Sequence, residues 1–350
     1  MRGIQWHGAG DLRYAELHEP LGDAPGEAVV EVDFCGVCGT DFAEVRNGPH
    51  MIRTMPHVLT GECAPLVLGH EFAGTIVATG PDVTVPVGTR VAVDPCWRCG
   101  RCFWCLRGDY HLCRLGVAVG LASNGALAPL VRVPAAGLVP LPDGVDTRVG
   151  ALVEPLAVAL HALARSAYEP GDSLGIIGFG PIGAAVLLIA RALGFGRIWV
   201  VEPARERRAL AATFAADEIV DPDPDLYRRV MDETSVGLDR VIDCSGHPDA
   251  VPSSINMVRR GGRLVVAGIC NQPVTLDLRR VVLFEREVVG SLGYRHDFPR
   301  VLSLLGSGRL DPAPLITRVV PFDGAADEIL RQSNEASGTD LKTLVEVRGA

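Results

Sequence analysis

The sequence predicts an α/β protein in which a doubly wound parallel sheet is joined to a second, β-rich domain. In about the first 150 residues, short alternating runs rich in valine, such as Glu27–Phe34 and Phe72–Gly80, are typical of strands separated by turns. Helix-like and strand-like runs then alternate, which is typical of βαβ units. The length of 350 residues also exceeds what one hydrophobic core usually supports, so two domains are expected.

The βαβ pattern is clearest in the middle third of the chain. A helix is predicted over Gly150–Ala164, a strand over Asp172–Gly180, a helix over Pro181–Gly194 and a strand over Arg197–Pro203. Further strand-like runs at Arg240–Gly246 and Gly262–Ile269 extend the parallel sheet toward Gly293. A dinucleotide-binding sheet would have this order of elements.

Composition points to a small-molecule partner. The formal net charge is −9, and no basic run is longer than Arg205–Arg208, which argues against nucleic acid or an anionic membrane as the main partner. The first residues show no secretory signal, so a reducing cytoplasm is expected. Ten cysteines in that compartment suggest metal binding or catalysis.

A glycine-rich loop connects the predicted strand to the predicted helix. The loop consists of Gly178, Gly180, Pro181, Ile182 and Gly183. The spacing G-x-G-x-x-G lets a backbone turn approach a pyrophosphate whose charge lies at the helix N-terminus. A tight turn in an ordinary α/β sheet is the alternative, and the strand, the helix and the later acid Glu202 count against it.

Glu202 ends the next strand and favours NAD as the cofactor. Its carboxylate can accept hydrogen bonds from the adenosine ribose and would repel the 2′-phosphate of NADP. Arg205, Arg207 and Arg208 could instead pair with a phosphate, although a solvated helix start also explains them. We expect Arg207 to contact the cofactor, and NADP is less favoured than NAD.

Four cysteines, Cys99, Cys102, Cys105 and Cys113, follow the pattern C-x2-C-x2-C-x7-C. This spacing lets one loop wrap four thiolates around a zinc ion. Four cysteines fill every position of a tetrahedral ion, so the zinc is expected to be structural. Cys96 is a fifth nearby thiol, which we interpret as a bystander.

A second set of possible ligands is scattered through the chain: Cys38, the pair His70 and Glu71, and Glu154. Any three of them could hold a metal and leave one position open for a substrate. Singly, each is unremarkable, since a lone cysteine is commonly a core residue. Their presence together with a nucleotide-binding pattern favours a catalytic metal.

Five segments of the sequence point to one family: "GVCGTD", "PLVLGHEFAG", "CGRCFWCLRGDYHLC", "EPLAVALHA" and "GFGPIG". Together they resemble the zinc-dependent medium-chain dehydrogenases, which include the alcohol and polyol dehydrogenases. The resemblance spans nearly the whole chain. It implies a GroES-like catalytic domain at 1–155, a Rossmann NAD-binding domain at 156–295 and a return to the catalytic domain at 296–350. Glu154 and the segment "PHVLTGECAPLVLGHEF" are similar to the sorbitol and 2,3-butanediol branch.

The resemblance also implies the catalytic ligands. Cys38 and His70 are expected to bind zinc, with Glu154 or Glu71 as the third ligand. One thiolate and one carboxylate neutralise Zn²⁺, and a second carboxylate would weaken its Lewis acidity. Glu154 is therefore favoured, with Glu71 as an outer or exchanging ligand. His161, seven residues after Glu154 on the predicted helix, is given a packing role.

The expected reaction transfers hydride from a secondary alcohol at the zinc site to NAD⁺. By resemblance, the hydroxyl of Thr40 passes the proton outward, and Asp41 accepts a hydrogen bond from the ring of His70. Ala43 stands where many relatives have a relay histidine, so either Glu44 or water is left to complete the path. Lys342 is matched to a position that meets the cofactor pyrophosphate.

The predicted function is an NAD-dependent zinc dehydrogenase of a vicinal diol or polyol, with two zinc ions per chain and a homo-oligomeric state, dimer or tetramer. Two alternatives remain open. The enzyme could act on a cyclitol, an amino sugar or threonine in secondary metabolism. The chain could also be a catalytically silent dinucleotide-binding protein, although such a protein needs no complete set of Cys38, His70 and Glu154.

Overall fold

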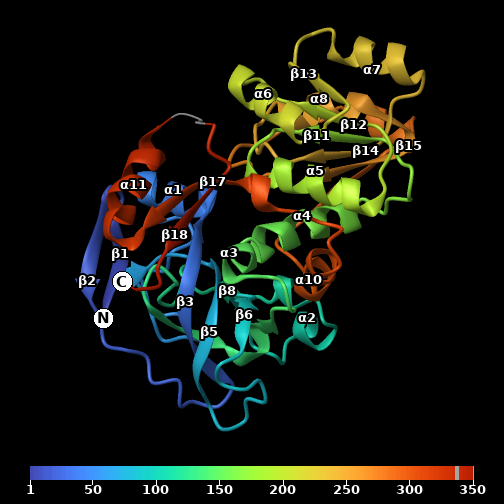
Figure 1. Cartoon of the computed structure of the whole chain (residues 1–350). Helices are drawn as coiled ribbons and strands as arrows, with labels where there is room; N and C mark the ends of the chain where they lie inside the picture. The colour runs from blue at the N-terminus through green and yellow to red at the C-terminus, as the bar shows by residue number, and fades with distance from the viewer. Residues whose placement is uncertain (336–338, 350) are drawn as a thin grey trace. The chain divides into compact units, whose positions relative to one another are not determined.

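The computed structural model describes residues 1–335 and 339–349, which fold into two compact units (Figure 1). Unit 1 comprises Met1–Glu154, Phe298–Gly306 and Ile316–Ala350, and unit 2 comprises Pro155–Asp297 and Ser307–Leu315. The passage Ser307–Leu315 through unit 2 lies inside the segment 296–350 that the sequence assigned to the first domain.

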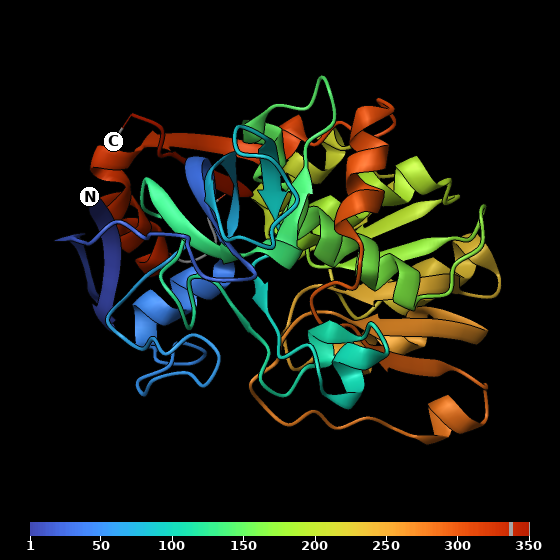
Figure 2. The same cartoon turned by 90° about the horizontal axis from the view of Figure 1, so that it is seen from below.

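Unit 1 is built on a seven-stranded sheet in which β10, β6, β5, β3, β18 and β17 lie in that order and β9 pairs with β3. Its strands are β3 (Glu27–Val37), β5 (Glu71–Thr79), β6 (Arg90–Val93), β9 (Leu130–Pro134), β10 (Leu138–Pro140), β17 (Ile316–Pro321) and β18 (Lys342–Glu346). The C-terminal strand β18, drawn in red, lies beside β3, drawn in blue (Figures 1 and 2). The last segment of the chain therefore completes the sheet begun by the first.

Smaller elements complete unit 1. A three-stranded sheet contains β2 (Asp11–Glu16), β1 (Arg2–Gly8) and β4 (Leu66–Val67), and β7 (Cys96–Trp97) pairs with β8 (Val117–Ala118). The helices are α1 (Gly39–Asn47), α2 (Phe103–Leu106), α3 (Thr147–Gly150), α10 (Phe298–Gly306) and α11 (Phe322–Asn334), with 3₁₀ turns at Tyr110–Leu112 and Ala135–Gly137.

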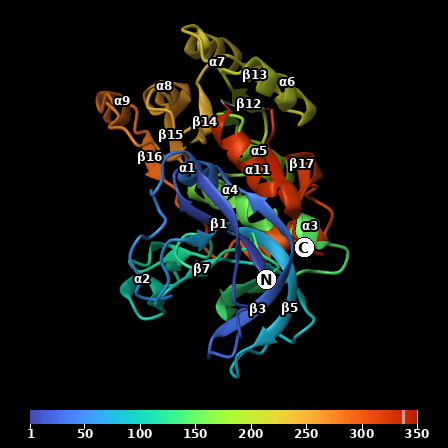
Figure 3. The same cartoon turned by 90° about the vertical axis from the view of Figure 1, so that its left-hand side faces the viewer.

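Unit 2 is a parallel six-stranded sheet in the order β13, β12, β11, β14, β15, β16 (Figure 3). The strands are β11 (Leu174–Ile177), β12 (Ile198–Val201), β13 (Glu218–Val220), β14 (Leu238–Asp243), β15 (Val258–Val266) and β16 (Glu287–Gly290). The helices are α4 (Val153–Arg165), α5 (Pro181–Leu193), α6 (Arg205–Thr213), α7 (Leu226–Thr234), α8 (Ala250–Met257) and α9 (Arg279–Val282), with a 3₁₀ turn at Ala313–Leu315.

This strand order confirms the predicted doubly wound sheet. Strands β11 and β12 are buried along their whole length, as expected for parallel strands covered on both faces. The order reverses between β11 and β14, and ligands bind outside the carboxyl ends of strands at such a switch point. His161, on α4, is buried with its Nδ1 3.1 Å from Asp297 Oδ2. None of the helices formed by the described residues has the length and apolarity that a bilayer crossing requires.

Candidate active site

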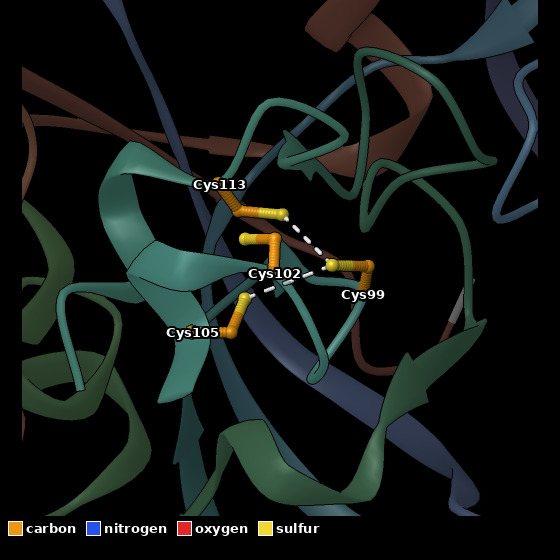
Figure 4. Close-up of side chains that lie close together, drawn as sticks. All are labelled: Cys99, Cys102, Cys105 and Cys113. Carbon is orange, nitrogen blue, oxygen red and sulfur yellow. Dashed lines mark hydrogen bonds between the residues drawn. The ribbon is translucent and has the colours of Figure 1, made fainter. Parts of the chain in front are cut away.

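The four cysteines converge as the spacing predicts (Figure 4). Cys102 is the N-cap of the short helix α2, and Cys113 follows the 3₁₀ turn Tyr110–Leu112. Cys99 Sγ lies 3.9 Å from Cys105 Sγ and 3.6 Å from Cys113 Sγ. Sulfurs around a tetrahedral zinc with bonds of about 2.3 Å lie about 3.8 Å apart, so the four side chains fit that ion.

Backbone amides favour a thiolate at Cys99 in this loop. The N–H groups of Arg101 and Cys102 lower the pKa of Cys99 to about 6. Cys96 behaves differently, because burial and Asp94 raise the pKa of its thiol to about 12. Its sulfur donates to Trp97 O at 3.6 Å and is not part of the four-sulfur group. The interpretation of Cys96 as a bystander agrees with this geometry.

The second cluster depends on Cys38 at the start of α1. Cys38 is the N-cap of that helix, and its backbone N–H donates to Asp41 Oδ2 at 2.9 Å, as in a capping box. The other Asp41 oxygen, Oδ1, lies 3.6 Å from His70 Nδ1. One carboxylate thus fixes the turn that carries Cys38 and also faces the ring of His70.

His70 immediately precedes β5 and follows Gly69, whose φ of +98° suits glycine. A Cβ on Gly69 would lie 2.6 Å from Cys35 Sγ, so the backbone directly before His70 has no room for a side chain. Burial opposes a charge on His70, but Asp41 and Cys38 outweigh it and raise its pKa well above the usual range. His70 Nδ1 and Asp41 Oδ1 are buried without a hydrogen-bond partner.

The ligand atoms of Cys38, His70 and Glu71 lie within 4.8 Å of one another. A thiol, an imidazole and a carboxylate are donors that zinc accepts, and three of them leave a fourth position open. The residues therefore fit a catalytic zinc ion.

Glu154 lies outside that trio of ligand atoms but belongs to the same electrostatic environment. Burial and the charge of Glu71 together raise the pKa of Glu154 to about 8, although His70 and Lys342 act in the opposite direction. The trio of ligand atoms therefore contains Glu71, whereas the sequence favoured Glu154 as the third zinc ligand.

Lys342 requires a correction. The sequence matched it to the cofactor pyrophosphate, but its side chain is buried in unit 1. Its Nζ donates to both oxygens of Glu71, at 2.8 and 2.7 Å, and to Val37 O at 3.3 Å. Burial alone would lower the pKa of Lys342, and the charges of Glu71 and Cys38 outweigh it. The ammonium of Lys342 is thus paired with Glu71 inside unit 1.

Gly36 makes this ion pair possible. Strand β3 separates β5 from β18, and Gly36 is paired with Glu71 on one side and with Leu344 on the other. A Cβ on Gly36 would collide with the carboxylate of Glu71. The missing side chain lets Glu71 and Lys342 meet across β3. Sequence reasoning missed Gly36, although a glycine inside a strand often marks such a close approach.

The proton path is only partly defined by side chains. Thr40 Oγ1 lies 3.7 Å from Cys38 Sγ, near the three ligand atoms. Glu44, one candidate to replace the histidine missing at Ala43, is fully buried. Its carboxylate accepts the backbone N–H groups of His50, Met51 and Ile52. Glu44 therefore holds the loop after α1 and is not available as a proton carrier.

The glycine loop follows β11 in unit 2 and has the expected shape. Gly178 has φ +87°, a Cβ on Gly183 would collide with Gly178 O, and Gly180 is the N-cap of α5 with Pro181 in the first turn. Ile182 follows in that turn. The backbone turn is therefore tight enough to bring N–H groups to a phosphate.

Glu202 and Arg207 lie beside this loop. Glu202 is buried, and its two oxygens accept the N–H groups of Phe179, at 2.7 Å, and Ala204, at 2.9 Å. Arg207 Nη1 lies 3.9 Å from the position a Cβ would occupy on Gly180. Arg208 instead donates to Glu202 O and Pro203 O, which fastens the turn after β12.

Comparison with known proteins decides the family. The family model described as alcohol dehydrogenase GroES-like domain matches residues 24–143, and that described as zinc-binding dehydrogenase matches residues 181–307. The chain is a zinc-dependent medium-chain dehydrogenase. The resemblance seen in the sequence is thereby confirmed, and this dehydrogenase is an oxidoreductase.

Three similar proteins bear on the function of this dehydrogenase. It is 35% identical over 334 residues to an (R,R)-butanediol dehydrogenase from Bacillus subtilis, covering 94% of each chain. It is 32% identical to an L-idonate 5-dehydrogenase from Vitis vinifera, covering 91% of this chain and 88% of the relative. The solved structure of a 2R,3R-butanediol dehydrogenase from Bacillus subtilis superimposes with a TM-score of 0.91 at 33% identity, covering 99% of both chains.

Proposed function

We propose that this dehydrogenase oxidises a secondary alcohol, either a vicinal diol or a polyol, to the ketone and transfers the hydride to NAD⁺. The observation that carries the proposal is the convergence of Cys38 and His70, whose ligand atoms lie within 4.8 Å of each other and of the Glu71 carboxylate. The identity of 35% to a butanediol dehydrogenase along 94% of the chain supports the diol class.

The catalytic zinc would be held by Cys38, His70 and Glu154, with a second zinc in the four-cysteine loop. Both oxygens of Glu71 are bonded to Lys342, so its use as a ligand would disrupt a buried ion pair. Glu154 forms no ion pair with any residue that the structure describes, and it is buried where the charges of Glu71 and His70 act on it. A bound zinc ion would polarise the substrate oxygen and lower the pKa of its hydroxyl.

The surrounding side chains would position and deprotonate the substrate. Asp41 would orient the ring of His70, since its Oδ1 faces His70 Nδ1 at 3.6 Å, beyond hydrogen-bond distance, and its Oδ2 is held by the N–H of Cys38. The hydroxyl of Thr40 would relay the proton of the alcohol, accepting it while donating its own proton outward. With alanine at position 43 and Glu44 occupied by three N–H groups, water carries the proton onward.

Unit 2 would bind NAD at the carboxyl ends of β11 and β12. The pyrophosphate would meet the N–H groups of the glycine loop at the start of α5, with Arg207 beside Gly180. Glu202 would accept the ribose hydroxyls, because each of its oxygens retains a free lone pair beside the N–H it already accepts. A 2′-phosphate would meet that carboxylate, so NAD is favoured over NADP.

A second candidate substrate class is a sugar acid, supported by the 32% identity to the L-idonate 5-dehydrogenase. A panel of vicinal diols, polyols, sugar acids, cyclitols and threonine, each assayed with NAD⁺ and NADP⁺ for the reduced nicotinamide, separates these classes. We expect the highest kcat/KM with a vicinal diol and NAD⁺. Turnover of none of them by zinc-loaded protein would contradict the proposal.

Assembly and location are further parts of the proposal. We expect a homo-oligomer, dimer or tetramer, because the edge strand β16 is largely exposed and Val282 and Leu283 beside it are each 72% exposed. Sedimentation velocity giving a monomer at micromolar concentration would contradict this. A reducing cytoplasm is supported by ten cysteines that are all free of disulfide bonds.

A further inference from the structure

An arginine in unit 2 is buried without an acidic partner. Arg286 directly precedes β16 and is 8% exposed. Its Nε donates to Arg259 O at 3.4 Å, and its guanidinium carbon lies 4.8 Å from the centroid of the Phe284 ring. Its Nη1 is buried with no hydrogen-bond partner. Buried arginines are ordinarily paired with a carboxylate or another oxyanion, so this one calls for an explanation.

Two further arginines lie close enough for their charges to act on Arg286. The guanidinium carbon of Arg260 also lies 4.8 Å from the Phe284 centroid, and Arg280 donates to Asn256 Oδ1 at 2.6 Å. Burial lowers the pKa of Arg286, Tyr227 opposes this, and the charges of Arg280 and Arg260 lower it further. Arg260 and Arg280 are exposed, so the cluster opens to solvent above the buried guanidinium.

The carboxylates near this cluster are engaged elsewhere. Asp239 binds Arg259 at 2.6 Å, and Glu287 binds Arg263 at 2.6 Å. Asp277 is held by Arg279 at 3.0 Å and reaches Arg280 only at 4.0 Å. Among the residues that the structure describes, neither Arg260 nor Arg286 forms an ion pair with a carboxylate.

The cluster lies at the opposite end of the sheet from the glycine loop. Gly261 N donates to Phe284 O at 2.9 Å, and Arg263 is in register with Glu287, so the cluster joins the amino-terminal ends of β15 and β16. The glycine loop follows the carboxyl end of the parallel strand β11. Figure 3 shows α9, β15 and β16 together at one side of unit 2. The arginines are therefore not part of the cofactor site.

We propose that Arg260, Arg280 and Arg286 form a binding site for a phosphate-type oxyanion, supplied either as inorganic phosphate or as the phosphate ester of a small metabolite. Guanidinium groups present paired N–H donors that match phosphate oxygens. Phe284 holds two of the guanidinium groups against one ring. The anion supplies the counter-charge that Arg286 lacks, and the acceptor that its Nη1 lacks, within the described part of the chain.

The test uses the zinc-loaded enzyme saturated with NADH, so that the glycine loop is occupied. Its melting temperature is followed against inorganic phosphate and glycerol phosphate, with potassium chloride at equal ionic strength as the reference. We expect a saturable rise in melting temperature with at least one phosphate. Tighter binding of the ester would identify esters as the source, and tighter binding of the free ion would identify inorganic phosphate.

Variants of exposed residues then locate the site without disturbing the core. Arg260→Ala and Arg280→Ala should weaken the apparent affinity about tenfold or more, since each removes charge-assisted hydrogen bonds. Arg13→Ala is the control, because Arg13 is an exposed arginine of unit 1 whose partner is Asp11. Equal affinity in all three variants, or a response no larger than that to chloride, would overturn the proposal. Dissociation of an oligomer by Arg260→Ala with unchanged phosphate affinity would also overturn it.

Discussion

The two candidate metal clusters of unit 1 differ in how the chain builds them. The four-cysteine loop draws all its ligands from Cys99–Cys113, and short turns and backbone N–H groups shape it locally. The other cluster draws on Cys38, His70 and Glu71, and it becomes complete only when Lys342 arrives on β18. Four ligands make a closed structural centre, whereas three ligands leave a position open.

The chemistry of the second cluster depends on the fold more than on any local sequence motif. Glu71 and Lys342 meet because β3 lies between their strands and offers Gly36 at the crossing point. Lys342 is also the single lysine of the chain. A compact ammonium can donate to two carboxylate oxygens and a carbonyl in a space where the larger, planar guanidinium cannot.

The largest effect is expected from removing a ligand of the four-cysteine loop. Cys99→Ser should reduce the zinc content from two ions to one per chain and destabilise unit 1 strongly, because structural zinc binding contributes up to about 10 kcal/mol to folding. Elemental analysis and thermal unfolding measure both effects. Cys96→Ser is the matched control, since this thiol lies in the same segment outside the four-sulfur group. Unchanged zinc content in Cys99→Ser would show that the loop binds no metal.

Cys38→Ser tests the other cluster and should act on the rate rather than on the fold. Loss of zinc polarisation of the substrate is expected to lower kcat/KM about 10⁴-fold, which is about 5.5 kcal/mol on the barrier. The melting temperature should change little, and the zinc of the four-cysteine loop should remain. Cys63→Ser serves as the control, because Cys63 is a free thiol of unit 1 outside both clusters. Full activity of Cys38→Ser would remove this cluster from the mechanism.

The same contrast explains what the sequence could predict. The parallel sheet, the glycine turn and the four-cysteine loop were predicted because their residues lie close together along the chain and follow local rules of spacing. The pairing of Lys342 with Glu71 was not, since it depends on strand order and on the register of Gly36 across three strands. The occupation of Glu44 by three backbone N–H groups was missed for a related reason, because it depends on how the loop after α1 folds back.

Lys342→Met should destabilise unit 1 by about 3–5 kcal/mol, because it leaves the buried carboxylate of Glu71 without its counter-charge. Urea unfolding measures the loss. The double variant Glu71→Gln with Lys342→Met should recover part of it, since the uncompensated charge is gone. Lys342→Arg keeps the charge and tests the geometry. Stability equal to that of the unaltered protein in both Lys342→Met and Lys342→Arg would mean that the pair contributes nothing to the cluster.

The smallest effect is expected from a local ion network, which sharpens the contrast with the buried pair. Arg331, three residues along α11, lowers the pKa of Glu328 to about 2 from 4.5, with Gln332 assisting. Since the folded pKa lies below the unfolded one, the stabilisation is present above pH 4.5 and is lost as the pH falls toward 2. Because Arg331 is 43% exposed, solvent screening reduces the effect, and Glu328→Gln should cost only about 1 kcal/mol at neutral pH.

Urea unfolding at neutral pH and at low pH measures this cost. The difference in unfolding free energy between Glu328→Gln and the unaltered protein should shrink as the pH falls. The control is Glu335→Gln, which removes an exposed partner of Arg331 and should cost less at either pH. A cost for Glu328→Gln as large as that for Lys342→Met would mean that burial is not what separates the two pairs.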